Sequence, residues 1–443
     1  MMTMTAMPKY ESYKDSGVEW LGEIPHDWTL ISLNRTVVSC VNGLWGNEPS
    51  GVNDIVVLRV ADFERNKLKI NDQKLTTRSI PLKDRSGRLL KNGDLLIEKS
   101  GGGDKTLVGC VVLFDKAYDA ITSNFVAKMT PKDNFDSRFL CYLFSALYSS
   151  NVNYRSIKQT TGIQNLDSGA YLSEVAAFPL LTTQTAIANF LDKKTTQIDE
   201  AIAIKEQQIA LLNERKQILI QQAVTQGLDP TVPMKDSGVE WIGKIPEHWE
   251  VRRSKFVFCQ RKERARADDV QLSATQAYGV IPQEQYEELI GRRVVKISFH
   301  LEKRKHVEID DFVISMRSFQ GGLERAWASG CIRSSYVVLR PVNKDEVDAG
   351  FFSYMLKLPT YINALQITAS FIRDGQDLNF DNFAKVDLFI PPVEEQKAIF
   401  YAIQSKVDEI NKSIVLFTDQ ITKYQEYKTT LINSAVTGKI KVV

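Results

Sequence analysis

The chain has 443 residues, 43% of them hydrophobic and 25% charged, so it has the composition of a globular protein with room for roughly two to four domains. Its formal net charge of +2 neither demands nor excludes a nucleic-acid partner, and any contact with DNA would need local basic patches. The five cysteines form no CxxC pair, no signal-peptide pattern opens the chain, and no apolar run approaches the ~18 residues that span a bilayer, so we expect a cytoplasmic protein with reduced thiols.

One stretch near the start of the chain is written twice. Residues 14–28 read KDSGVEWLGEIPHDW and residues 235–249 read KDSGVEWIGKIPEHW, with eleven of fifteen positions identical. Such self-similarity indicates an internal duplication with a pseudo-two-fold axis. The tryptophans of the two copies either plug the core of their own domain or contact another subunit, and both interpretations stay open: Trp20, Trp28, Trp241 and Trp249.

A mixed region follows each copy of this stretch. In the first region, short β-rich runs bounded by Gly, Asn or Asp predict strands at 54–63, 93–100, 107–114 and 123–129 and a helix at 139–147. The second region has the same order, with strands at 310–316 and 334–340 and a helix at 351–358. We therefore predict that 29–178 and 250–389 are two copies of one α+β domain.

A second pair of repeats, 184–225 and 396–437, aligns without a gap at an offset of 212. In both, apolar residues step alternately by four and three, which is the heptad seam of a coiled coil, and neither segment contains Gly or Pro. Gly227 and Gly438 are placed to end the two helices. Two matched helices in one chain predict an intramolecular antiparallel pair. Three seam lysines are expected to set its register or to mark a docking site for a partner subunit: Lys205, Lys216 and Lys428.

No catalytic motif is legible in the sequence. The four histidines are not spaced from cysteines or carboxylates as metal ligands are, so we predict neither a metal site nor a catalytic residue. The string SGGGDKT at 100–106 has Asp104 where a phosphate-binding loop needs glycine, and no glycine fingerprint for a nucleotide follows a strand. An acid-x-lysine pattern at 72–74 vaguely echoes a metal nuclease, which keeps a self-contained endonuclease as an alternative.

Basic and amide side chains gather at matched places in the two mixed regions. These side chains contact phosphates and read base edges, although a run of charge also suits a solvated face. Glycine-rich loops at 100–103 and 321–322 are placed where the backbone could approach a phosphate. The residues predicted to contact DNA are Lys99, Lys105, Arg155, Lys158, Gln159, Gln164 and Asn165 in the first region, and Arg261, Lys262, Arg264, Arg317, Gln320, Arg373 and Gln376 in the second.

The order of these features resembles the specificity subunit of type I restriction–modification systems over essentially the whole chain. The features are KDSGVEWxGxIPxxW, a variable α+β domain, a GIQNL or GQDL element, a proline-flanked helix start and a heptad helix ending in A-V-T, then all of it again. The resemblance implies two target-recognition domains that each read one half of a bipartite DNA site. It also implies an antiparallel pair of spacer helices that set the distance between the half-sites and dock methyltransferase subunits.

The resemblance further implies that this chain is not an enzyme and holds no cofactor. Two methyltransferase subunits would supply S-adenosylmethionine, and motor-nuclease subunits would use ATP and Mg²⁺. The chain departs from the family pattern where Thr183-Gln184 stands in place of the Glu395-Gln396 of the second copy, so we expect weaker capping of the first helix. A coiled-coil scaffold that binds proteins and no DNA is the alternative, but it does not explain two matched domains.

The expected fold is α+β, with two target-recognition domains, two long helices forming an antiparallel coiled coil, and an internal pseudo-two-fold duplication. The expected domains are an N-terminal segment at 1–28, recognition domain 1 at 29–178, a spacer helix and linker at 179–233, the second tryptophan stretch at 234–249, recognition domain 2 at 250–389 and the second spacer helix at 390–443. The half-site sequences do not follow from the resemblance.

Overall fold

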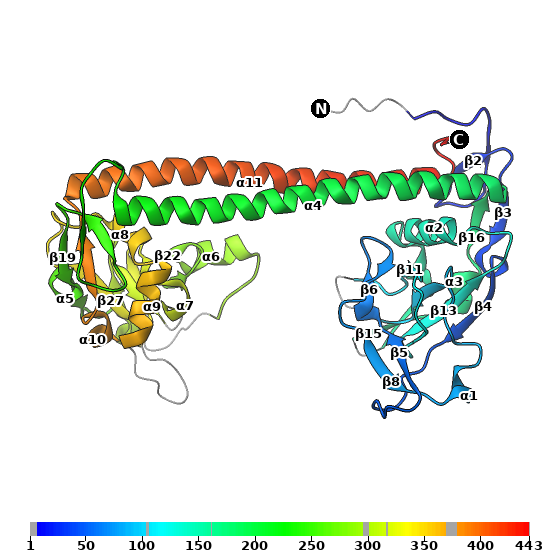
Figure 1. Cartoon of the computed structure of the whole chain (residues 1–443), viewed down its shortest axis with the longest axis horizontal. Coiled ribbons are helices and arrows are strands. Elements are labelled where there is room, and N and C mark those ends of the chain that lie inside the picture. The colour runs from blue at the N-terminus through cyan, green and yellow to red at the C-terminus, as the bar shows by residue number, and fades with distance from the viewer. Residues whose placement is uncertain are drawn as a thin grey trace. The chain divides into compact units, whose positions relative to one another are not determined.

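The computed structural model describes residues 7–102, 106–160, 162–295, 301–315, 318–368 and 379–442. The chain forms two compact units: unit 1 is Met1–Gln207 with Phe417–Val443, and unit 2 is Gln208–Leu416. Each unit contains one α+β domain and part of two long helices, α4 (Leu181–Gln226) and α11 (Val393–Val436), which are the green and orange-red helices of Figure 1.

The α+β domain of unit 1 is organised around an antiparallel sheet in the order β11-β9-β13-β4 (Val111–Leu113, Leu95–Glu98, Val126–Pro131, Val37–Asn42). Helix α2 (Ser137–Ser149) packs its apolar face on the core of this domain, and the Asp136 carboxylate caps it by accepting hydrogen bonds from two backbone N–H groups. Two further sheets have the orders β12-β5-β8 (Ala120–Thr122, Asp54–Leu58, Thr76–Ser79) and β10-β15-β14 (Ser100–Gly101, Ile163–Leu166, Ile157–Thr160). The smaller elements are β6 (Phe63–Glu64), β7 (Lys69–Ile70), α1 (Leu82–Arg85) and α3 (Ser168–Leu172).

The α+β domain of unit 2 has a corresponding antiparallel sheet in the order β20-β27-β24-β25 (Phe258–Arg261, Val337–Pro341, Phe312–Ile314, Glu324–Arg325). Two-stranded sheets join β21 to β22 (Leu272–Thr275, Gly279–Pro282) and β23 to β26 (Lys305–Val307, Gly330–Ile332). Its helices are α5 (Ser254–Val257), α6 (Gln283–Ile290), α7 (Ser318–Gly321), α8 (Ala349–Met355), α9 (Pro359–Thr368) and α10 (Phe380–Phe383).

The duplication predicted from the sequence is present in the fold. The tryptophan stretches form the hairpins β1–β2 (Tyr13–Asp15, Glu23–Pro25) and β17–β18 (Met234–Asp236, Lys244–Pro246). The strand after each hairpin pairs with the strand that leads into a long helix, β3 with β16 (Thr29–Ser32, Val175–Phe178) and β19 with β28 (Glu250–Arg253, Asp387–Ile390). Matched glutamines begin the helices: Gln184 Oε1 accepts from the Asp136 N–H at 3.1 Å, and Gln396 Oε1 accepts from the Asp348 N–H at 2.8 Å.

The long helices run antiparallel in each unit. In unit 1, Lys428 Nζ lies 2.7 Å from both carboxylate oxygens of Asp199, so the end of α11 lies against the first half of α4. In unit 2, Lys216 Nζ lies 3.2 Å from Asn411 Oδ1. The helices end where the sequence predicts, because Gly227 and Gly438 follow them at φ +76° and +73°.

Each tryptophan stretch packs on the C-terminal end of a long helix. Trp28 shares a core with Leu431 of α11, and Trp249 shares one with Val224 of α4. Both indole side chains are 0% exposed, so Trp28 and Trp249 belong to the cores of their own units. Because they offer no accessible surface, the prediction that these two residues contact another subunit is wrong. Trp20 and Trp241 are half-buried.

No helix within the residues described above is long and apolar enough to cross a membrane. All five cysteines are free thiols.

Candidate nucleic-acid interface

Four candidate DNA-contact residues of the first domain lie on one small sheet, β10–β15–β14. Lys158 faces Asn165 across the strand pair, and Gln159 faces Gln164. Lys158, Gln159 and Asn165 are exposed. Gln164 is 5% exposed, and its Oε1 accepts from the backbone N–H of Val108 at 3.1 Å. The sheet thus presents a lysine and two amides to solvent, while Gln164 holds the neighbouring loop and is not placed for a base.

The basic side chains of Lys99, Arg155 and Lys158 make only exposed contacts with their neighbours. Lys99 Nζ donates to Asn42 Oδ1 at 2.9 Å, and Lys158 Nζ lies 2.9 Å from Asp167 Oδ2. Arg155 pairs with Glu19 at 3.1 Å, with exposed fractions of 76% and 88% for the two side chains. Exposed ion pairs contribute little to stability, and Lys99 holds only a neutral amide oxygen, so all three cations can exchange their partner for a phosphate. Lys105 lies outside the described residues.

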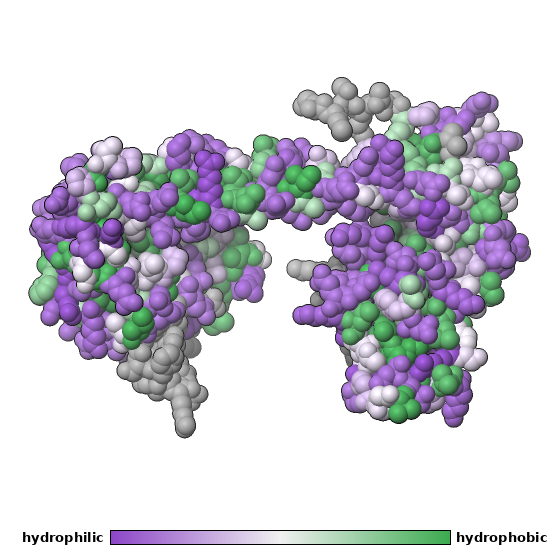
Figure 2. All heavy atoms as spheres, in the orientation of Figure 1, coloured by the Kyte–Doolittle hydropathy of each residue, from purple (hydrophilic) through white to green (hydrophobic). Residues whose placement is uncertain are grey.

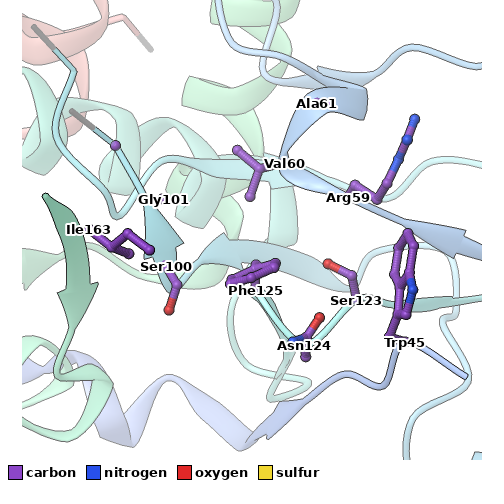
Figure 3. A pocket seen from close by; sticks show the side chains of 11 residues that line it. Trp45, Arg59, Val60, Ala61, Ser100, Gly101, Ser123, Asn124, Phe125 and Ile163 are labelled. Carbon is purple, nitrogen blue, oxygen red and sulfur yellow. The ribbon is translucent and has the colours of Figure 1, made fainter. Parts of the chain in front are cut away.

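A hollow of about 510 Å³ opens beside this sheet. Figure 3 shows Ser100 and Gly101 on one side of it, Trp45 on the other, and Phe125 between them. Three apolar side chains that line the hollow are partly exposed: Trp45 by 38%, Phe125 by 47% and Ile163 by 54%. Large aromatic faces in contact with water, next to cations and amides, suit the stacking and hydrogen bonding by which proteins hold nucleic acid.

Backbone geometry and charge both hold this hollow in shape. Gly102 has φ +67°, and a Cβ there would lie 2.8 Å from Gln164 Oε1, so the loop that lines the hollow requires glycine. The Arg78 guanidinium lies 4.4 Å above the Trp45 ring, which fixes the indole by a cation–π contact. Arg59 pairs with Asp62 at 2.8 Å.

No pattern in the sequence pointed to Trp45, Arg59 or Phe125. They come from three segments that are separate in the chain, and no periodicity relates them. Exposure of an aromatic side chain could have identified Trp45 and Phe125, but exposure is a property of the folded domain.

Three of the residues predicted to contact DNA in the second domain are exposed. Lys262, Arg264 and Gln320 are exposed, and neither basic side chain forms an ion pair with another described residue. The prediction that Arg261 contacts DNA is wrong. The Arg261 side chain is 4% exposed, and its guanidinium lies 2.7 Å from Asp311 and 2.8 Å from Glu263, so this buried cation holds the domain together and has no surface for DNA. Three candidates lie outside the described residues: Arg317, Arg373 and Gln376.

The seam lysines of the helices also differ from one another. Lys428 is 9% exposed and donates to the Asn66 carbonyl at 2.7 Å as well as pairing with Asp199, so it ties α11 to the first domain and is no docking site. Lys205 lies 4.4 Å above the Phe417 ring and Lys216 bonds Asn411, and both side chains are partly exposed. These contacts suit a role in register.

An apolar stripe runs along the outer face of α4. Ile204, Leu211 and Ile218 follow one another at intervals of seven and are exposed by 55%, 55% and 47%. Figure 2 shows hydrophobic surface on the long helices amid polar surface. Residues at heptad spacing share one helix face, and exposed apolar stripes of this kind mark contact with a partner helix.

Two histidines are closer to carboxylates than their spacing in the sequence indicates. His248 Nε2 lies 2.7 Å from Glu395 Oε2, and His306 Nδ1 lies 2.9 Å from the Asp269 carboxylate. The sequence places no histidine at metal-ligand spacing from a carboxylate, and these two partners could not be foreseen because they are 147 and 37 residues away along the chain.

Comparison with known proteins shows which proteins this chain is similar to. Residues 47–214 match the model of the type I restriction modification DNA specificity domain. A relative from Methanocaldococcus jannaschii, provisionally named as the type I restriction enzyme MjaX specificity subunit, is 22% identical over 454 aligned positions that cover 100% of both chains. The MjaVIII specificity subunit of the same organism is 23% identical over 95% of this chain and 94% of its own.

Two solved structures share the fold. A chain from work on complex assembly and conformational transition of the type I R-M system has a TM-score of 0.67 at 12% identity, and the match covers 93% of this chain and 98% of that one. The HsdS subunit from Thermoanaerobacter tengcongensis has a TM-score of 0.52 at 13% identity, and the match covers 94% and 98%. At these identities the likeness concerns the fold: two α+β domains joined by a pair of long helices.

Proposed function

We propose that this chain is a member of the type I restriction–modification specificity-subunit family and the DNA-recognition subunit of such a complex. Each α+β domain reads one half of a bipartite site, and α4 and α11 set the distance between the halves. The chain itself is not catalytic. Two methyltransferase subunits with S-adenosylmethionine modify the site, and motor-nuclease subunits with ATP and Mg²⁺ restrict DNA that lacks the modification.

The observation that carries this proposal is the exposed strand pair of unit 1 beside the aromatic hollow. Lys158, Gln159 and Asn165 project from β14 and β15, and the hollow adds the faces of Trp45 and Phe125. Lysine supplies sequence-independent attraction to phosphates, and amides can pair with the edge of a base. We assign base contacts to Gln159 and Asn165 and phosphate contacts to Lys99, Arg155 and Lys158.

The second domain contributes a looser basic surface. Lys262 and Arg264 follow β20 on the exposed side of unit 2, and Gln320 lies on α7. We assign these residues, together with Arg317, Arg373 and Gln376 of the sequence, to the other half-site.

The helices carry the proposed docking surface for the methyltransferase subunits. The stripe on α4 begins at Ile204, and the duplication relates this residue to Leu416 of α11, which is also 55% exposed. This one matched pair supports an equivalent contact at each of the two helices, whereas Leu211 and Ile218 correspond to the polar Lys423 and Thr430. The half-buried Trp20 and Trp241 lie on the repeated hairpin stretches and are assigned to the edge of the same contacts.

The test is binding of fluorescent duplex DNA by the chain together with its methyltransferase subunits. We expect binding that weakens steeply with salt, and Lys158→Ala should weaken it by several-fold, whereas Lys9→Ala, at another exposed lysine of unit 1, should not. If the complex binds no duplex at low salt, the chain is a protein-binding scaffold. Mg²⁺-dependent cleavage by the isolated chain would instead indicate an endonuclease.

A further inference from the structure

Three side chains with metal-ligating atoms converge in the α+β domain of unit 2. Glu263 follows β20, His306 lies in β23, and Glu308 follows β23, and one ligand atom of each lies within 4.8 Å of the other two. His306 is 2% exposed, and its Nδ1 lies 2.9 Å from both oxygens of Asp269. A carboxylate that holds one ring nitrogen so that the other can ligate is the usual surrounding of a metal-bound histidine.

The second ring nitrogen of His306 has no hydrogen-bond partner among the described residues. Nε2 is buried, makes no hydrogen bond to a described residue, and has Glu308 Oε1 at 3.8 Å. Buried polar side-chain atoms are nearly always paired. When Nδ1 donates its proton to Asp269, Nε2 presents a lone pair to the carboxylates of Glu263 and Glu308. Such an arrangement is repulsive unless a cation lies among the three groups.

Two exposed arginines lie beside these groups, and the farther one, Arg340, has its Nη1 3.8 Å from Glu263 Oε1. Arg266 Nη2 is 3.3 Å from Glu263 Oε2 and 3.4 Å from Glu308 Oε1, and the Arg266 side chain is 54% exposed. Charge-assisted hydrogen bonds between nitrogen and oxygen are usually ~2.7–2.9 Å long, so this guanidinium is held weakly.

A second arginine positions the same carboxylates from the buried side. Arg261 is 4% exposed, and its nitrogens lie 2.8 Å from Glu263 Oε1 and 3.0 Å from Glu308 Oε2. This leaves Glu263 Oε2 and Glu308 Oε1, the two oxygens that Arg266 reaches, for another positive group.

We propose that Glu263, His306 and Glu308 bind a divalent transition-metal ion, Zn²⁺ in the first instance, in the place that the Arg266 guanidinium takes here. One imidazole and two carboxylates suit Zn²⁺, and three protein ligands leave a fourth position for water. Mg²⁺ and Ca²⁺ prefer oxygen ligands throughout. Ligand bonds of ~2.0–2.2 Å require the three groups to move together by about 1 Å, which rotation of the glutamate side chains supplies. The ion ties the segment after β20 to strand β23, and this role is independent of DNA recognition.

The test uses the purified full-length chain, cleared of metal with a chelator, and Zn²⁺ titrated against a chromophoric competitor. We expect this site to bind one Zn²⁺ ion per chain. We also expect Zn²⁺ to raise the melting temperature more than Mg²⁺ does at the same concentration. His306→Gln should remove this ion, and Asp269→Asn should weaken its binding about 10- to 100-fold. Arg266→Ala removes a competing cation, so it should tighten binding about two- to fivefold. The matched control is Arg333→Ala, at another exposed arginine of unit 2.

Opposite effects at Arg266 and at His306 separate this site from the free cysteines, which also bind Zn²⁺. Binding that persists in His306→Gln assigns the ion to other groups and overturns the proposal. Weaker binding in Arg266→Ala, or an equal response to Mg²⁺, also overturns it. If His306→Gln does not fold, Asp269→Asn and Arg266→Ala decide. No DNA enters the assay, so its result does not depend on the proposed recognition function.

Discussion

Glu324 lies in β25 with 2% of its surface exposed, and one carboxylate oxygen is 2.7 Å from the Lys357 ammonium. Burial raises the pKa of Glu324 from 4.5 to about 7, although Lys357 opposes the shift. The pKa is higher in the folded chain than in the unfolded chain. The associated stability is therefore fully present below about 4.5 and is lost as pH rises through about 7.

Glu324→Gln should remove this pH dependence, because glutamine has a similar shape and does not ionise. Relative to the unaltered chain, we expect the variant to gain free energy of unfolding between pH 5 and pH 8, by up to about 3 kcal/mol. Urea unfolding at both pH values measures the difference, and the exposed Glu288→Gln is the control. If Glu324→Gln and the unaltered chain change in parallel with pH, the buried carboxyl is not the cause.

The kinds of residue at the candidate site were predictable, but their burial was not. Arg261 and Lys262 are neighbours in one basic run, yet Arg261 is 4% exposed among three carboxylates and Lys262 is exposed. Arg261 faces the core because it is the last residue of β20 and because Glu308 and Asp311, from a distant segment, surround its guanidinium. A charge run cannot show this, because its partners lie far away in the sequence.

Among the secondary-structure elements, the helices were the most predictable. Heptad spacing places helices at 184–225 and 396–437, and the structure has them at Leu181–Gln226 and Val393–Val436. The run predicted as a strand at 54–63 is instead divided into β5, a 3-10 turn at Val60–Asp62 and β6. Local polar contacts break that strand: Asp62 Oδ2 accepts from the Arg59 N–H at 2.7 Å and closes the turn.

The spacer role of the helices gives a prediction about DNA. Seven residues added to both helices, after Ile209 and after Ile421, keep the heptad register and add about 10 Å to each helix at ~1.5 Å per residue. At ~3.4 Å per base pair, we expect the unread spacer of the methylated motif to grow by about three base pairs while both half-sites stay the same. Long-read methylation mapping of cells with the doubly extended chain measures the motif.

Seven residues added to α4 alone serve as the control, because they mismatch the seam and should lower the melting temperature or prevent assembly. An active, doubly extended variant whose spacer keeps its length would show that the helices do not set the distance.

For the molecule as a whole, the first and last segments of the chain contact each other within unit 1. The Lys441 N–H donates to the Pro8 carbonyl at 2.7 Å, and Lys439 Nζ donates to the Leu21 carbonyl at 2.7 Å. Trp28 packs on the end of α11 in the same way as Trp249 packs on the end of α4. The chain runs directly from α4 to the hairpin before Trp249, whereas α11 and the hairpin before Trp28 lie at opposite ends of the sequence.

A circular permutant should therefore fold. If a short Gly-Ser linker joins the present termini and new termini open between Leu228 and Asp229, in the exposed segment before β17, we expect a melting temperature within a few degrees of the original. A permutant opened after Ile209 interrupts α4 and is the control. Should the first variant unfold as readily as the control, the end contacts seen in unit 1 do not replace a covalent link.

At this scale the sequence predicted the repeat and its order, since identical residues recur at fixed offsets. The contacts that close the chain and the hollow beside β15 were not predictable. Both bring together segments from distant parts of the chain, such as Trp45 and Phe125, whose side chains follow no shared pattern.

The central claim, that each domain reads its own half of one DNA site, is tested by a domain exchange. Residues 250–389 are replaced by the recognition domain of another family member, and the methylated motif is mapped in cells that also make the methyltransferase subunit. We predict that one half of the motif changes and that the half read by 29–178 is retained with the same spacer. A motif in which both halves change together, or in which neither changes, would contradict the account.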